Sequence, residues 1–120
     1  MKKETSEFKS RIPEFNEWLI LEKGLSKRVS GDIISRCKRI EKYISPDLHD
    51  AVSTEDNFQE LIGNIVSYSR SMLVDAHKAS NLKKSLVHAA KHYALFSFNE
   101  NAQKYAKTIR VKWNGNPAEK

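Results

Sequence analysis

The sequence contains few of the residues that crosslink small secreted proteins or interrupt helices. Its 120 residues include one cysteine, four glycines and three prolines. A single cysteine excludes an internal disulfide and a cysteine-based metal site. Charged residues interrupt every apolar stretch, so no run reaches the roughly 20 residues that a membrane span needs. The charged start of the chain is not followed by the apolar segment of a secretory signal. These absences predict a cytoplasmic protein without a metal ion or cofactor.

Acidic residues are scarce in the second half of the chain. Residues 61–120 contain ten Lys or Arg and three Asp or Glu, whereas residues 1–60 contain 11 and 12. The formal net charge is +6 at pH 7. Such an imbalance bears on association rather than on fold, and nucleic acid is the first partner to consider. The simpler alternative is an ordinary basic surface of solvated lysine side chains.

The most regular stretch begins after Gly24, which we expect in a left-handed conformation, and runs to Ile44. Ser26 is a suitable N-cap, because its hydroxyl can accept a hydrogen bond from an amide of the first turn. Apolar residues then recur three or four apart, which places them on one helix face: Val29, Ile33, Cys37, Ile40 and Ile44. The other face is basic. We therefore expect a helix with Cys37 buried and its cations exposed.

The remaining chain shows the same helical periodicity and no β-strand alternation. Helices are expected at about residues 13–22, 27–44, 55–73, 81–97 and 99–109. The third has Ser53 or Thr54 as its cap, and its apolar stripe extends to Met72 and Leu73. A turn is expected at residues 78–81. The prediction is an all-α protein, a compact bundle of four to five helices.

The expected domain organisation is simple. A frayed N-terminus covers residues 1–10, a single helical domain covers 11–110, and a flexible C-terminal tail covers 111–120.

Two basic helix faces are the candidate nucleic-acid interface. If the helices at 27–44 and 81–97 pack as neighbours, their cations can line one groove and contact phosphates. The candidate residues are Lys27, Arg28, Arg36, Arg39, Lys83, Lys84, His88 and Lys91. No side chain is placed clearly enough to predict base contacts.

Other chemistry has weaker support. His88 and His92 are four residues apart, a spacing compatible with a metal, but no neighbouring Glu or Cys completes a site, and both are expected at the surface. Trp18 and Tyr93 fit a core better than a base-stacking platform. No nucleophile–base pair is evident, so we expect no enzyme.

Two segments resemble a known family. Residues 15–19 read FNEWL, residues 24–26 read GLS, and apolar residues follow four apart; residues 81–96 form a helix with leucines, alanines and a terminal aromatic cluster. Together they resemble the SAM-like, N-terminal core-binding domain of tyrosine recombinases, the phage-integrase type. The sequence departs from that pattern at Val29, where the family usually has Thr, and at Ile33, where Tyr is common.

The resemblance implies a domain that lies across one face of double-stranded DNA and holds its phosphates as half of a clamp. The family's catalytic domain, with its Arg, His-x-x-Arg and nucleophilic Tyr, is not expected here, because no His-x-x-Arg occurs in this sequence. We therefore expect a non-enzymatic DNA-binding protein linked to DNA recombination in a phage or mobile element, or a fragment of a longer enzyme. The alternative is a protein-interaction module that binds an acidic partner, in which the C-terminal tail with Trp113 could dock.

Overall fold

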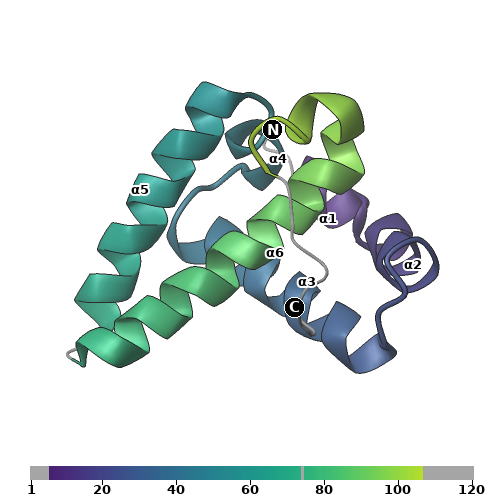
Figure 1. Ribbon diagram of the computed structural model, residues 1–120. Coiled ribbons are helices and arrows are strands. Elements are labelled where there is room, and N and C mark those ends of the chain that lie inside the picture. The colour runs from purple at the N-terminus through teal and green to yellow at the C-terminus, as the bar shows by residue number, and fades with distance from the viewer. Residues whose placement is uncertain (1–5, 74, 107–120) are drawn as a thin grey trace, which may run out of the picture.

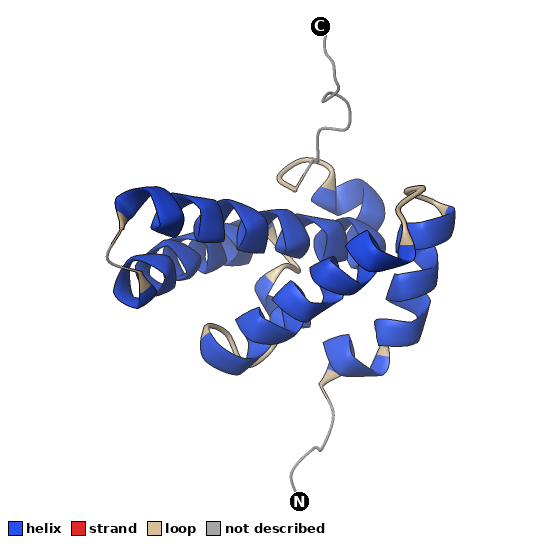
Figure 2. Cartoon of the chain, turned by 90° about the horizontal axis from the view of Figure 1, so that it is seen from below, coloured by secondary structure: helices blue, strands red, loops and turns tan. Residues whose placement is uncertain are grey.

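The computed structural model describes residues 6–73 and 75–106, and within these ranges helices joined by short loops are its regular secondary structure (Figures 1 and 2). The predicted all-α class is confirmed. The helices are α1 (Glu7–Ser10), α2 (Ile12–Leu21), α3 (Lys27–Tyr43), α4 (Leu48–Ala51), α5 (Glu55–Met72) and α6 (Ala76–Ala102). None of these helices is long and apolar enough to span a bilayer.

Side-chain caps fix where the long helices begin. The Ser26 hydroxyl accepts a hydrogen bond from the Val29 amide at 3.2 Å, and Thr54 Oγ1 accepts one from the Asn57 amide at 3.1 Å. Each bond satisfies an amide that has no partner inside its own helix. Gly24 has a φ of 71°, a conformation that glycine adopts at little cost, and it allows α2 to turn into α3. These local predictions are confirmed.

Helix α6 is the central element of the fold. It crosses the front of the molecule in Figure 1 and packs against both α5 and α3. At the crossing with α3, the Cys37 thiol lies 3.4 Å from the Ala89 carbonyl oxygen. Small side chains at Ala89 and Ala90, both fully buried, allow this close approach. Burial raises the pKa of the Cys37 thiol, which agrees with its predicted place in the core.

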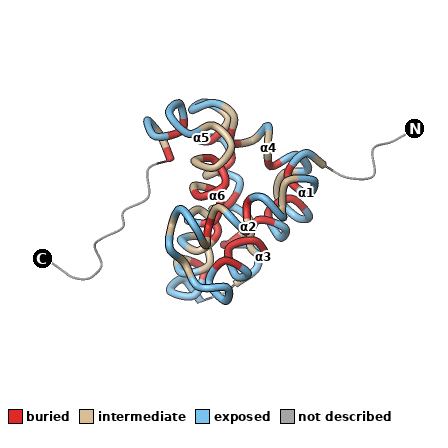
Figure 3. The backbone as a smooth tube through the Cα atoms, turned by 90° about the vertical axis from the view of Figure 1, so that its right-hand side faces the viewer, coloured by how far each residue is buried: buried red, intermediate tan, exposed pale blue. Residues whose placement is uncertain are grey.

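Aromatic rings fill the space between α6 and the N-terminal helices. Figure 3 colours the buried residues of these helices red. Phe8 and Phe15 meet the Tyr93 ring edge-on, at centroid distances of 5.1 and 5.3 Å. All three side chains are fully buried. Such contacts add roughly 1 kcal/mol per pair beyond the burial of apolar area.

The N-terminal part departs from the predicted frayed segment. Residues 7–10 form α1, and Phe8 is fully buried. The carboxylate of Glu41 on α3 accepts a hydrogen bond from the Ser6 hydroxyl at 2.8 Å and another from the Leu48 amide at 3.0 Å. One side chain thus ties α3 to the beginnings of α1 and α4. Residues 1–5 are outside the described ranges.

The predicted start of the last long helix is wrong by about one turn. No turn occurs at residues 78–81, because Asp75 begins α6 and its carboxylate accepts hydrogen bonds from the amides of His77 and Lys78. Near its other end α6 bends at Asn99, whose φ is 35°. The helix predicted at residues 99–109 begins at this bend, but α6 ends at Ala102. The predicted tail and Trp113 lie outside the described residues.

Three side chains occupy different environments from those predicted. Val29 in the first turn of α3 is 41% exposed and Met72 in the last turn of α5 is 52% exposed, although both continue an apolar stripe. His92, expected at the surface, is 4% exposed.

Candidate nucleic-acid interface

The outer face of α6 carries a stripe of two lysines with a histidine between them. Lys84, His88 and Lys91 follow each other at spacings of four and three residues, which places them on one side of the helix. Lys84 and His88 are exposed, and Lys91 is half-buried. None of the three forms an ion pair with a carboxylate in the described ranges. Three of the four candidate residues of this helix, all but Lys83, therefore share one face.

Arg36 brings α3 to this stripe. The pKa of His88 is lowered by partial desolvation and by the positive charges of Arg36, Lys91 and Lys23. A charge has this effect only when it lies close to the imidazole. The chain therefore gathers cations from α3, α6 and the end of α2 around one histidine. Because its pKa lies below the usual value of 6.5, His88 is mainly neutral at pH 7.

His92 lies beneath this cluster. Its Nδ1 is 3.0 Å from the His88 carbonyl oxygen, and the two rings are 4.4 Å apart. Burial lowers the pKa of His92 to about 4, so its ring is neutral at physiological pH. Among the described residues, no three His, Cys, Asp or Glu side chains are placed to hold a metal ion.

Two predicted residues, Lys27 and Arg28, stand at the start of α3. Both are exposed. They extend the positive charge along α3 away from its crossing with α6.

Arg39 belongs to a different part of the surface. Its Nε donates a hydrogen bond to the Tyr68 hydroxyl of α5 at 2.9 Å, and its guanidinium lies 5.7 Å from the centre of that ring. The Tyr43 ring stacks on the Tyr68 ring. The two ring centroids are 6.2 Å apart, and the ring planes are 18° from parallel. We call Arg39, Tyr43 and Tyr68 the tyrosine cluster. Sequence reasoning did not select the tyrosines, although the spacing of four from Arg39 to Tyr43 was a usable signal.

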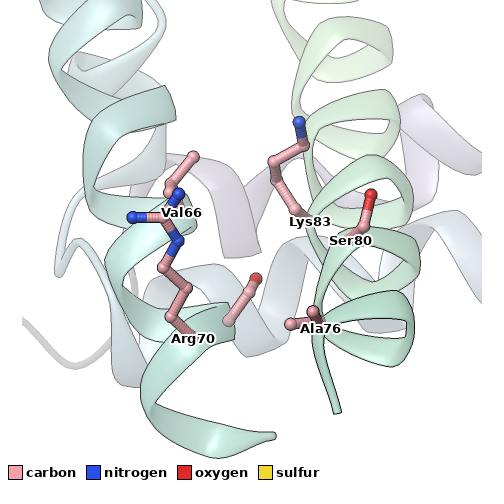
Figure 4. Close-up of a pocket in the computed structure, with 7 residues that line it drawn as sticks. Val66, Arg70, Ala76, Ser80 and Lys83 are labelled. Carbon is pink, nitrogen blue, oxygen red and sulfur yellow. The ribbon is translucent and has the colours of Figure 1, made fainter. Parts of the chain in front are cut away.

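Lys83 turns from the stripe toward α5. It lines a cavity of about 300 Å³ between α5 and α6, and Arg70 stands on the opposite wall (Figure 4). Tyr68 and Arg70 are two residues apart, or about 200° around α5. The tyrosine cluster and this cavity therefore lie on different sides of α5. The eight predicted residues do not form one continuous surface.

Charge is also divided along the length of α5. A second cavity of about 250 Å³ lies beside its N-terminal half, lined by the carboxylates of Asp47, Asp50 and Glu60. Arg70 and the first cavity lie beside its C-terminal half. In Figure 1 the N-terminal end of α5 is its upper end, and the C-terminal end is its lower end. The acidic segment that the sequence places at 47–60 is thus kept apart from the cationic surfaces.

Comparison with known proteins gives no family assignment. No family model, no curated protein and no solved structure matches this chain.

Proposed function

We propose that this chain is a non-enzymatic domain that binds double-stranded DNA through its phosphates. The observation that supports the proposal is the crossing of α3 and α6 at Cys37 and Ala89, which brings the neighbouring Arg36 and His88 to the same part of the surface. Arg36, His88 and Lys91 form no ion pair with a described carboxylate. The positive charges of Arg36 and Lys91 repel each other, and on binding they would replace counterions condensed on the DNA phosphates. Lys84 extends the contact on α6, and the exposed Lys27 and Arg28 at the start of α3 are further candidate contacts. We call Arg36, Lys84, His88 and Lys91 the α3–α6 patch.

The biological setting is part of this proposal. The resemblance to the core-binding domain of tyrosine recombinases favours an accessory protein of a phage or mobile element, or the DNA-holding part of a longer enzyme. A cytoplasmic location is part of the proposal.

Fluorescence anisotropy with a labelled duplex tests the proposal. Log affinity should fall linearly with log salt, with a slope of about −0.9 for each phosphate contacted. Loss of two contacts in Arg36→Gln/Lys91→Gln should weaken binding at least tenfold at roughly 0.1 M salt and make the slope about 1.8 units shallower. Circular dichroism should remain unchanged.

Lys9→Gln/Lys104→Gln is the matched control, because it removes the same charge from two exposed positions outside the patch. It should change affinity much less. Equal losses in both double variants would show that binding follows net charge rather than the patch, and a salt-independent affinity would refute phosphate binding.

A protein-interaction module is the competing function. Leu21, Tyr43 and Met72 are 69%, 59% and 52% exposed, and large exposed side chains of this kind often serve protein contacts. If the purified protein retains no nucleic acid at low salt, as measured by its absorbance ratio, this function is favoured.

A further inference from the structure

The cavity between the C-terminal half of α5 and the start of α6 has the composition of an anion site. Arg70 and Lys83 stand on opposite walls, with Ser80 and Ala76 along the α6 side (Figure 4). Neither cation forms an ion pair with a described carboxylate. Asp75 caps the start of α6 near this cavity, and its Oδ1 accepts hydrogen bonds from the amides of His77 and Lys78.

Ser69 supplies a second, independent observation. It lines the same cavity and is 1% exposed, yet its hydroxyl oxygen has no hydrogen-bond partner. A buried hydroxyl without a partner costs free energy. A ligand oxygen that reaches it would satisfy that hydroxyl without displacing a bond to water. The cavity therefore contains an unused donor beside two cations.

The chemistry of the walls indicates the ligand. Two cationic groups balance the double negative charge of a phosphate monoester, and guanidinium, ammonium and hydroxyl groups are suitable donors to its three terminal oxygens. A carboxylate would leave some of these donors unused. Val66, Ala76 and Ala79 line the same space, and about 300 Å³ accommodates a small organic group beside the phosphate.

We propose that the α5–α6 cavity binds a small phosphate monoester, held by Arg70, Lys83 and the hydroxyls of Ser69 and Ser80. The site goes beyond the proposed DNA binding and does not depend on it, because Ser69, Arg70 and Ser80 are not part of the α3–α6 patch. Lys83, selected from the sequence as a DNA contact, is assigned to this cavity instead.

Titration of the ¹⁵N-labelled protein with inorganic phosphate, phenyl phosphate and benzoate tests the site. Phenyl phosphate should give saturable amide shifts centred on residues 69, 70, 80 and 83 and should bind more tightly than inorganic phosphate or benzoate. Arg70→Gln and Lys83→Gln should each weaken its binding by roughly tenfold, the usual effect of losing a charge-assisted hydrogen bond. Lys78→Gln, at an exposed position on the same helix, should bind as the wild type does.

Ser69→Ala separates ligand binding from folding. Removal of an unpaired buried hydroxyl should leave the thermal midpoint equal or higher, while phenyl phosphate binds more weakly. Shifts that do not saturate, or an equal loss in Lys78→Gln, would overturn the proposal. Displacement of phenyl phosphate by duplex DNA would overturn it as well, because the cavity would then belong to a DNA surface. A protein that binds no DNA but passes the titration leaves this site intact.

Discussion

Acidification should destabilise this protein through His92. The ring is 4% exposed, and burial lowers its folded-state pKa to about 4, against an ordinary value of 6.5. Below pH 6.5 the unfolded chain takes up a proton at this histidine that the folded chain does not. The stability present above pH 6.5 is therefore lost as the pH falls toward 4.

The size of the effect follows from the two pKa values. Linkage gives a loss of unfolding free energy of about 2 kcal/mol between pH 7 and pH 5, and about 3 kcal/mol by pH 4. The free energy of unfolding of a typical domain is roughly 5–15 kcal/mol, so this loss is a large part of it. Nearby positive charge acts in the same direction, since Lys23 lies close enough to lower the pKa of His92 further.

Urea unfolding followed by circular dichroism at pH 7, 6, 5 and 4 measures this loss. The control is His92→Gln, which keeps a polar side chain but cannot titrate. Other groups contribute to acid unfolding in both proteins, so the difference between the two curves isolates His92. The reasoning is refuted if the two curves run parallel, or if the His92 imidazole resonance titrates near pH 6.5 in the folded protein.

Two further predictions concern buried groups. Glu41→Gln should lower the free energy of unfolding by about 1.5–3 kcal/mol. The two oxygens of Glu41 accept separate hydrogen bonds from the Ser6 hydroxyl and the Leu48 amide, and the NH₂ group that replaces one oxygen can accept neither. Chemical denaturation measures the loss, and a loss no greater than that of exposed Glu14→Gln would contradict the prediction. The Cys37 thiol, whose pKa burial raises, should react with a disulfide reagent at least about a hundredfold more slowly in the folded protein than in urea; comparable rates would show that the thiol is accessible.

The sequence predicts those parts of the fold that depend on neighbouring residues. The caps at Ser26 and Thr54 and the positive φ at Gly24 are set within a few residues, and the structure has them. The start of α6 was missed because its polar first turn looks like a loop, although Asp75 caps it. Val29 and Met72 fit their periodic stripes, but periodicity cannot tell where the partner helix ends.

The candidate site also contains features that neighbouring residues determine and features that depend on helix packing. The shared face of Lys84, His88 and Lys91 follows from their spacing on one helix, and their role in binding stays a prediction. The neighbours of Arg39 and Lys83 depend on where α5 packs, which no local pattern determines. Arg70 was not selected for the same reason, since only the fold brings it opposite Lys83.

The separation of charge along α5 affects how the molecule is oriented before it meets a charged partner. With carboxylates beside one end of that helix and cations beside the other, the molecule carries a permanent electric moment. Near a polyanion this moment produces a torque that turns the acidic N-terminal end of α5 away. Encounter would therefore be oriented within about a Debye length of the partner, roughly 8 Å at physiological salt.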